Sequence, residues 1–337
     1  MAEIMRTIHK TMTAFVFTTV LISGCGSDGS PSGPGGGSGG FIPDSTTATI
    51  AVGESPQEIC CIPSESYLYA STGGSGDVYV ISSSDNEVAE IIHIGSSPNG
   101  ICADPNGDYI YVVNHSNNGC VSVIDTYSNE VVGDIEVAGD WPQDICCLPS
   151  GEYLYVTNWW TCNTVTVIRT SDNSVVDQIP VGTTPLGICA LPSGDYVYVT
   201  NLDAGTVSVI RTSDNEVTAT IEVGSNPGSI CSLPTGDHVY VSNYISDDVS
   251  VIRTSDNTVV STIEVGNEPY QVQTASSGAY VLVSNHADDN VYVIDTEDNT
   301  VASSFEVESS PRGICVLETL DRAYVCNNGS NTVSVIE

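Results

Sequence analysis

The sequence predicts a closed seven-bladed β-propeller with four antiparallel strands in each blade. Two observations predict it: a unit of about 42 residues repeats seven times, and the two ends of the chain each supply part of one unit. Every unit opens on a proline that follows a short turn, and neighbouring prolines lie 42 to 44 residues apart. These marker prolines are Pro56, Pro98, Pro142, Pro185, Pro227, Pro269 and Pro311.

Within each unit, four short stretches rich in Val, Ile, Tyr and Thr alternate with turn residues, as half-buried strands do. In the unit from Pro185, the expected strands a, b, c and d are Gly187–Leu191, Tyr196–Asn201, Thr206–Arg211 and Glu216–Val223. Pro-Ser-Gly-Asp at 192–195 and Ser-Asp-Asn at 213–215 are typical of hairpin turns. A four-stranded antiparallel unit at this period indicates a propeller blade rather than a helical solenoid.

The two chain ends support ring closure independently. The last unit stops after strand c, at Thr332–Glu337, and has no strand d. Its missing strand stands at the other end, because Ala48–Gly53 matches Ala219–Gly224 and no strand a, b or c precedes it. Pairing these ends removes two open sheet edges that otherwise invite aggregation. We therefore expect the N-terminal strand to complete blade 7.

Strand b carries Tyr-Val-Thr-Asn or a close variant in most units, and Thr-Val-Ser-Val-Ile or a similar run follows in strand c. The copies are Tyr155–Asn158 and Tyr198–Asn201, with variants at Tyr111–Asn114, Tyr240–Asn243 and Tyr324–Asn327. This pattern resembles the YVTN-type β-propeller repeats. The resemblance implies an envelope or surface protein of a bacterium or archaeon, and it carries over no catalytic residue because the motif is structural. Blade 1 departs from the motif at Tyr69–Thr72, so we expect it to be less regular.

The N-terminus has the pattern of an export signal. Arg6 and Lys10 precede an apolar run, Ala14–Ile22, that is too short to span a bilayer. Cys25 follows, in a sequence that resembles the bacterial lipoprotein signal, in which this cysteine becomes the lipidated first residue. An ordinary secretory signal is the alternative.

We divide the chain accordingly into a signal peptide at 1–24, a tether at 25–44 and the propeller at 45–337. The tether is mostly Gly, Ser and Pro, a composition that builds no core. Gly26 follows the lipidated position, where lipoproteins retained in an inner membrane often have Asp. We therefore expect an exported protein that is lipid-anchored to the outer membrane or cell surface.

The charge of the chain excludes several partners. The formal net charge is −35, and after Cys25 the chain has five arginines, no lysine and 41 acidic residues. Such a polyanion repels nucleic acid and anionic headgroups, so we expect a protein or glycan partner, membrane contact through the lipid only, and a monomer. No cofactor is expected. The Asp pairs Asp247–Asp248 and Asp288–Asp289 either gather Ca²⁺ or only form turns.

Cysteine recurs four residues after the marker proline in six of the seven units, with Gln273 as the exception. The series is Cys60, Cys102, Cys146, Cys189, Cys231 and Cys315. A thiol ring on the innermost strand would suit a soft metal, but buried thiols acting as small apolar side chains are the simpler interpretation. Cys315 and Cys326 are expected on one face of adjacent strands, which makes them a candidate disulfide.

The loops of one propeller face vary more than those of the other. The d-to-a and b-to-c loops emerge on the same face, and the site after the motif Asn differs in every blade or nearly so. It reads Gly73, His115, Trp159, Leu202, Tyr244, His286 and Asn328. The opposite face repeats Ser-Asp-Asn almost unchanged. We expect binding on the variable face, because loops on a rigid scaffold carry recognition residues.

All three tryptophans of the chain belong to the variable face of blade 3. Clustered Trp beside carboxylates is typical of a binding hot spot or a sugar-stacking platform, although the rings can also simply cover the blade end. The candidate binding residues are Trp141, Trp159, Trp160, Asp140 and Asp144, with Tyr244, Tyr270 and Arg312 as an extension around the rim. We interpret His115 and His286 as turn residues too far apart on the ring to share a ligand.

The sequence contains no recognisable catalytic motif. It therefore predicts a non-enzymatic, membrane-tethered binding or scaffold module for a protein or glycan partner. The first alternative is an envelope enzyme of the propeller lactonase or dehydrogenase kind, which rests on analogy between folds and requires convergent polar groups at the axial mouth. The second alternative is a purely architectural surface protein.

Overall fold

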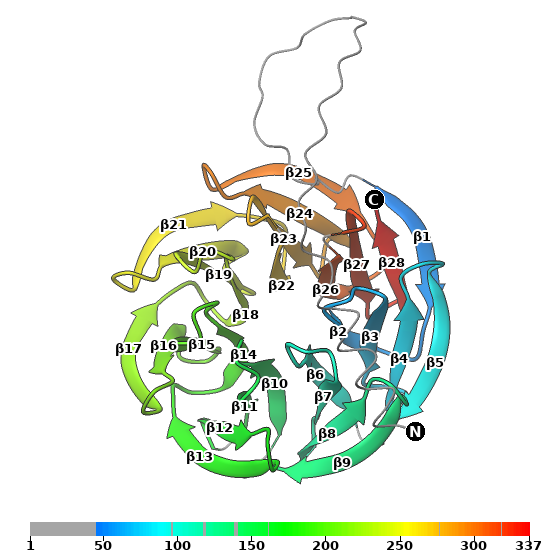
Figure 1. Ribbon diagram of the computed structural model, residues 1–337. Coiled ribbons are helices and arrows are strands. Elements are labelled where there is room, and N and C mark those ends of the chain that lie inside the picture. Colours follow the sequence, from blue (N-terminus) through cyan, green and yellow to red (C-terminus); the bar gives the residue numbers. More distant parts are fainter. Residues whose placement is uncertain are drawn as a thin grey trace, which may run out of the picture. The chain divides into compact units, whose positions relative to one another are not determined.

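The computed structural model describes residues 45–337, apart from 96, 117–118, 138–140, 161, 276 and 318. These residues form seven four-stranded antiparallel sheets arranged as a ring around a central axis (Figure 1). The proposed signal peptide, the tether with Cys25, and Asp140 lie outside the described residues. In the part of the chain that the structure describes, no helix is long and apolar enough to cross a membrane.

Each blade begins with an innermost strand a, which opens on the marker proline. These strands are β2 (Pro56–Cys61), β6 (Pro98–Ala103), β10 (Pro142–Cys147), β14 (Pro185–Ala190), β18 (Pro227–Ser232), β22 (Pro269–Thr274) and β26 (Pro311–Leu317). Strand b, which carries the motif, follows in each blade. These strands are β3 (Tyr67–Thr72), β7 (Tyr109–Asn114), β11 (Tyr153–Asn158), β15 (Tyr196–Asn201), β19 (His238–Asn243), β23 (Tyr280–Asn285) and β27 (Arg322–Asn327).

Strand c lies next and strand d forms the outer edge of each blade. The c strands are β4 (Asp77–Ser82), β8 (Cys120–Asp125), β12 (Thr164–Arg169), β16 (Thr206–Arg211), β20 (Asp248–Arg253), β24 (Asn290–Asp295) and β28 (Thr332–Ile336). The d strands are β5 (Glu87–His93), β9 (Glu130–Glu136), β13 (Ser174–Pro180), β17 (Glu216–Glu222), β21 (Thr258–Glu264), β25 (Thr300–Glu306) and, in blade 7, β1 (Thr46–Ala51).

The predicted closure of the ring is confirmed. Strand β1 pairs with β28 in antiparallel register, so that Ala48 lies opposite Val335 and Ile50 opposite Val333. The N-terminal strand thereby forms the outer edge of the last blade, where the blue and red ends of the chain meet in Figure 1.

The strand prediction is close but starts strand a too late. Pro185 itself pairs with Asn201, and the register shifts by a bulge before Ile188 pairs with Val199. The expectation of an irregular blade 1 is wrong. Its Pro56 pairs with Thr72 across the same kind of register shift, and the Thr72 hydroxyl donates to the carbonyl of Asp77 on the next strand.

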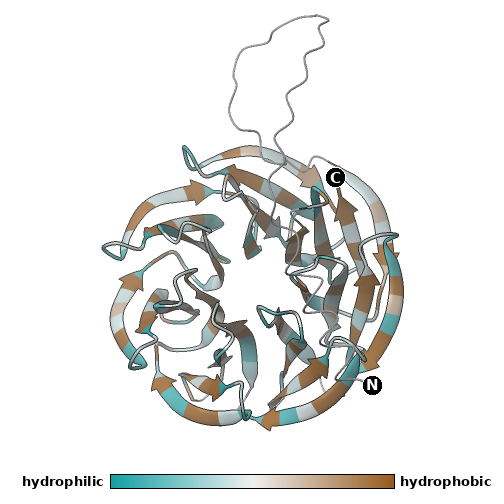
Figure 2. Cartoon of the chain, in the orientation of Figure 1, coloured by the Kyte–Doolittle hydropathy of each residue, from teal (hydrophilic) through white to brown (hydrophobic). Residues whose placement is uncertain are grey.

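The core lies between blades rather than within one central cluster. In the contact between blades 4 and 5, Tyr198 and Val207 pack with Ile230 and Val239. Equivalent clusters join the other neighbouring blades around the ring. Figure 2 shows hydrophobic residues recurring along the strands while the turns are mostly hydrophilic. Each buried Val or Ile contributes about 1.5–3 kcal/mol to folding, so every blade depends on both of its neighbours.

The first residue of the motif ties five of the blades to the next one. The Tyr198 hydroxyl donates a 2.7 Å hydrogen bond to Oδ1 of Asn257, in the c-to-d hairpin of blade 5. Asn257 turns that hairpin with a φ of 55°, a conformation that Asn tolerates better than most residues. The same bond joins Tyr69 to Asn129, Tyr155 to Asn215, Tyr240 to Asn299, and Tyr324 to Asn86.

Blade 6 is the one that lacks the motif tyrosine, and the ring closure explains this. Its residue is Leu282, which is 1% exposed and packs in the core. The next blade has no c-to-d hairpin to receive a hydroxyl, because its strand d comes from the N-terminus. The tyrosine is thus missing from the one blade whose neighbour takes its strand d from the N-terminus.

Most cysteines of the inner strands are partly buried beside the inter-blade cores, and Cys231 and Cys315 are buried. Burial raises the pKa of the Cys231 thiol to about 12 and keeps it neutral. The structure does not contain the disulfide expected between Cys315 and Cys326, and both are free. Cys315 lies opposite Tyr324, so that Cys326 is two residues farther along the facing strand, a diagonal and not a directly opposite position. The described residues contain no group of three or more His, Cys, Asp or Glu arranged to hold a metal ion.

We predict that the Tyr198–Asn257 bond couples blades 4 and 5. In a double-mutant cycle of Tyr198→Phe and Asn257→Gly, which keeps the positive φ, the coupling free energy from urea unfolding should be about 1 kcal/mol. Leu282→Met in blade 6 is a matched control and should show no coupling to Asn257→Gly. A coupling near zero for the Tyr198 pair would show that this bond does not stabilise the ring.

Candidate functional site

The third residue of the motif positions the site. In blade 4, the Thr200 hydroxyl accepts the N–H of Gly187 at 2.8 Å and donates at 2.6 Å to the carbonyl of Gly228 in blade 5. The equivalent donations run from Ser71 to Asn99, Thr157 to Leu186, Ser242 to Tyr270, and Ser284 to Arg312. Each motif hydroxyl therefore fixes the backbone of the residue after the next blade's proline, and all five of these residues line the cavity described below.

A second repeated bond fixes the residue after the motif Asn. In blade 5, the N–H of Tyr244 donates at 2.9 Å to the carbonyl of Asn226, the residue before the marker proline. The residue before the proline has a left-handed φ in all seven blades: Ser55, Ser97, Trp141, Thr184, Asn226, Glu268 and Ser310. The backbone of the variable face is thus alike in all seven blades at these two positions, where the side chains differ.

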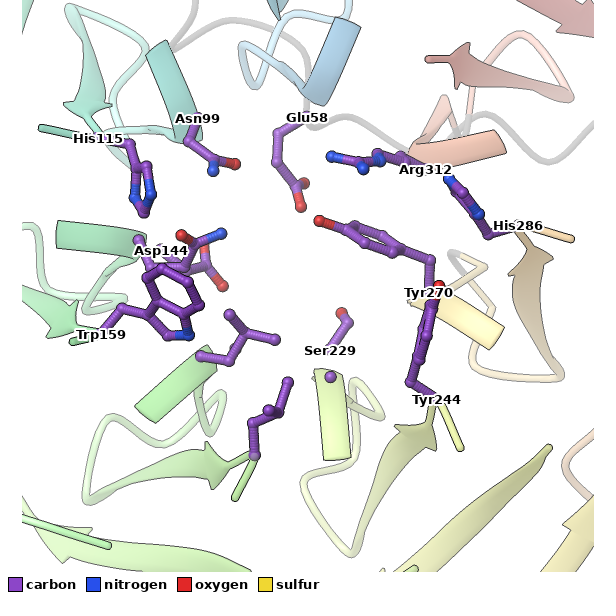
Figure 3. A pocket seen from close by; sticks show the side chains of 15 residues that line it. Glu58, Asn99, His115, Asp144, Trp159, Ser229, Tyr244, Tyr270, His286 and Arg312 are labelled. Carbon is purple, nitrogen blue, oxygen red and sulfur yellow. The ribbon is translucent and has the colours of Figure 1, made fainter. Parts of the chain in front are cut away.

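These side chains enclose a cavity of about 350 Å³ at the axial mouth, to which all seven blades contribute (Figure 3). Its polar wall consists of Glu58, Asn99, Gln143, Asp144, Ser229 and Arg312, its ring-bearing wall of His115, Trp159, Tyr244, Tyr270 and His286, and its apolar floor of Leu186, Leu202, Gly187 and Gly228. This size and mixture are typical of sites for small molecules.

The second residue after each marker proline decides which side chains reach the axis. Glycine stands there in blades 2, 4 and 7, as Gly100, Gly187 and Gly313. A Cβ atom on Gly187 would lie 2.5 Å from the carbonyl oxygen of Gly228, so the inner strands can approach only if this residue is glycine. The space left beside the glycines allows the side chains of Glu58 and Asp144 into the cavity.

Glu58 and Asp144 form an acidic pair held by defined hydrogen bonds. The Asp144 carboxylate accepts the N–H of Ile145 at 2.7 Å and that of Ile188, in the next blade, at 3.1 Å. Glu58 accepts a 3.0 Å bond from Nε2 of Gln271. Burial, with the like charge of Asp144, raises the pKa of Glu58 to about 8, and burial raises the pKa of Asp144 to about 6. Both carboxyl groups therefore hold a proton more tightly than exposed carboxyl groups do.

Aromatic rings and histidines form two groups on the cavity wall. On the blade 3 side, His115 packs against Trp141 and Trp159 with centroids 5.0 and 5.5 Å apart. On the other side, the Tyr244 hydroxyl donates at 2.5 Å to Glu268, and the His286 ring lies 6.0 Å from Tyr270. Burial lowers the pKa of both histidines, so they are neutral at pH 7.

Two buried N–H groups of the cavity wall have no hydrogen-bond acceptor in the described residues: Nε of Arg312 and Nε1 of Trp159. The Arg312 guanidinium lies 4.6 Å from the centre of the Tyr270 ring, and its Nη1 donates a hydrogen bond to Oε1 of Gln57. A buried donor without an acceptor costs about 1–3 kcal/mol, which a bound acceptor would recover.

The structure brings together five of the predicted binding residues: Asp144, Trp159, Tyr244, Tyr270 and Arg312. Trp141 packs on the His115 ring, and Trp160, which is 62% exposed, packs on Trp159 with ring centroids 5.2 Å apart. Neither Trp141 nor Trp160 lines the cavity. Contrary to the expectation of remote turn residues, His115 and His286 both line it, because inner side chains from opposite blades converge at the axis.

The prediction missed Glu58, Asn99, Gln143 and Ser229. Each stands one or two residues after a marker proline, and that spacing is the signal that could have identified them. The Asp pairs of the b-to-c turns serve as hydrogen-bond acceptors: Asp247 accepts the N–H of Glu268 at 2.9 Å, and Asp289 accepts that of Ser310 at 2.8 Å.

Comparisons with known proteins agree on the architecture. A family model described as YNCE-like β-propeller matches residues 47–196, which is less than half of the chain. The chain is a seven-bladed β-propeller. No curated protein matches it. A chain of Kuenenia stuttgartiensis hydrazine synthase is similar in structure, with a TM-score of 0.78 and 19% identity, over 90% of this chain and 99% of that one. At this identity the likeness shows the fold alone.

The acidic pair makes stability depend on pH. The pKa of Glu58 rises from an ordinary 4.5 to about 8 on folding, so the folded state binds a proton that the unfolded state releases between these pH values. Stability contributed by this site is therefore lost as pH rises from about 4.5 to 8. We expect Glu58→Gln to melt at least about 2 °C above the parent at pH 8, with the difference vanishing near pH 4.

Thermal unfolding of both proteins between these pH values tests the prediction. Glu222→Gln, which changes an exposed carboxylate on strand β17, is the matched control and should follow the parent at every pH. If the melting temperatures of Glu58→Gln and the parent differ by the same amount at every pH, the raised pKa of Glu58 is contradicted.

Proposed function

We propose that this protein is a non-enzymatic binding module of the cell envelope that holds a small polar group in its axial cavity. The group is either free or exposed on a protein or glycan partner. The observation that carries the proposal is the cavity itself, in which ring-bearing and polar side chains from seven blades converge on about 350 Å³. A purely architectural protein has no need for buried donors that lack an acceptor, as at Arg312 and Trp159.

The proposed location rests on the N-terminal sequence and on the YVTN-like repeats. A lipid on Cys25 would hold the propeller at an outer membrane or cell surface, and the tether at 25–44 would let it move relative to that surface. The acidic composition supports contact with the membrane through the lipid alone, because anionic headgroups repel such a chain.

An acid–base enzyme is the second candidate. The convergent polar groups that an enzyme requires at the axial mouth are present, and the pKa values of Glu58 and Asp144 are both raised by burial. A neutral acid beside a carboxylate is a common arrangement for proton transfer. Binding remains the function that the geometry supports best, because in the described residues no hydrogen bond joins either carboxyl group to a hydroxyl or thiol of the cavity wall.

The two neighbouring tryptophans of blade 3 allow a matched test of the cavity. We expect Trp159→Phe, which removes the unpartnered N–H, to weaken binding of any small ligand found by thermal-shift screening by about tenfold. Trp160→Phe removes an equal ring outside the cavity and should leave affinity within about twofold. Isothermal titration calorimetry measures both. Equal losses in the two variants would show that the ligand binds elsewhere on the blade.

Membrane attachment is tested at Cys25. We expect Cys25→Ser to move the protein from the membrane pellet to the soluble extracytoplasmic fraction, because one acyl-carrying residue supplies the whole anchor. Cys162→Ser, which changes an exposed cysteine of the propeller, should leave the protein in the pellet. If Cys25→Ser stays in the pellet, the lipid anchor is wrong.

A further inference from the structure

Arg312 differs from the other arginines of the propeller. Arg169, Arg211 and Arg253 each bind an aspartate three residues later in a c-to-d hairpin, and Arg322 binds Glu337. Within the described residues, Arg312 has no carboxylate oxygen within ion-pair distance. It lies against the Tyr270 ring at the cavity wall, with Nε buried and without an acceptor. In the sequence after Cys25, which has five arginines and 41 acidic residues, this leaves a positive group available to an anion.

A fixed negative group stands elsewhere on the same wall. Two backbone N–H groups, of Ile145 and Ile188, orient the Asp144 carboxylate and occupy two of its four acceptor positions. The described part of the chain places no arginine, lysine or histidine within ion-pair distance of it. The remaining acceptor positions of Asp144 are therefore open to a donor that carries a positive charge.

Glu58 separates the two charges. Figure 3 shows its side chain pointing into the cavity between Arg312 and Asp144, and Gln271 holds it there. Burial and the like charge of Asp144 raise its pKa, so it holds a proton more tightly than an exposed carboxyl group does. The cavity wall thus presents one positive group and one negative group, with a carboxyl group of raised pKa between them.

Resting on the proposed binding function, we infer that the ligand is a small zwitterion with a primary ammonium and a carboxylate, as in amino acids and short peptides. The carboxylate binds the Arg312 guanidinium, and the ammonium binds Asp144. The Trp159 N–H takes an oxygen of the ligand, and Leu186 and Leu202 contact its apolar part.

The overall charge favours a zwitterion over an acidic ligand. The field of a chain with a net charge of −35 repels an anion, whereas a zwitterion brings no net charge and satisfies both charged groups of the wall. A neutral saccharide would leave Arg312 and Asp144 without a counter-charge. Glycan binding is therefore the competing outcome of the test.

Matched ligands test each charge separately. Residues 26–337, which contain the whole closed ring, are titrated by calorimetry with the twenty common amino acids, their alanine dipeptides and a set of neutral saccharides. The best zwitterion is then compared with its N-acetyl and C-amide derivatives. We expect each derivative to bind at least about tenfold more weakly than the parent ligand.

Variants assign each charge to its residue. Arg312→Gln should bind the zwitterion and its C-amide equally, and Asp144→Asn should bind the zwitterion and its N-acetyl derivative equally. Arg322→Gln, an arginine outside the cavity, should keep the parent's ratios. Since Asp144→Asn can also disturb the blade contact, the Arg312→Gln result decides alone if Asp144→Asn unfolds.

The outcomes separate the inference from the proposed function. Saccharide binding that is lost in Trp159→Phe, without zwitterion binding at about 10 mM, would overturn the zwitterion and retain the binding module. Zwitterion binding in which both derivatives bind as well as the parent would also overturn the assigned charges. Binding of neither class would overturn both the inference and the proposed function.

Discussion

The contact between neighbouring blades is the constraint on which the rest of the structure depends. A single four-stranded sheet cannot bury its apolar faces alone. Here each blade covers a face of the next, as Tyr198 of blade 4 packs with Ile230 of blade 5. A chain of such contacts has two ends unless it closes, and the pairing of Ala48 with Val335 removes both. The stability of one blade is therefore inseparable from the closure of the ring.

The motif residues serve this contact and the binding face at the same time. Tyr198 bonds to the hairpin on one face of the next blade, while Thr200 bonds to the carbonyl of Gly228 on the other. Because the bonds run through backbone carbonyls and a turn asparagine, the side chains of the variable face are free to change without loss of the scaffold. That separation explains how a regular repeat carries an irregular cavity.

The fold could be predicted because both of its features can be seen in the sequence. The seven marker prolines show the repeat, and the two incomplete units at the chain ends show how the ring closes. The site could be predicted only in part. Trp159 and Arg312 are conspicuous by type, whereas Glu58 stands on a strand that resembles its neighbours in composition, and its approach to Asp144 depends on where seven strands meet. The disulfide failed for a related reason, since Cys315 lies opposite Tyr324 and Cys326 is only its diagonal neighbour, a register that spacing does not reveal.

The odd number of blades adds a constraint of its own at the axis. Glycine alternates with larger residues at the second position after the marker proline, but seven positions cannot alternate throughout, so Ser229 and Gln271 are neighbours. Gln271 uses the space beside Gly313 to donate to Glu58, two blades away, while its Oε1 accepts the N–H of Ile314 at 2.6 Å. Because Gly313 leaves this space, Gln271 fixes the carboxyl group that lies between the two charged groups of the cavity wall.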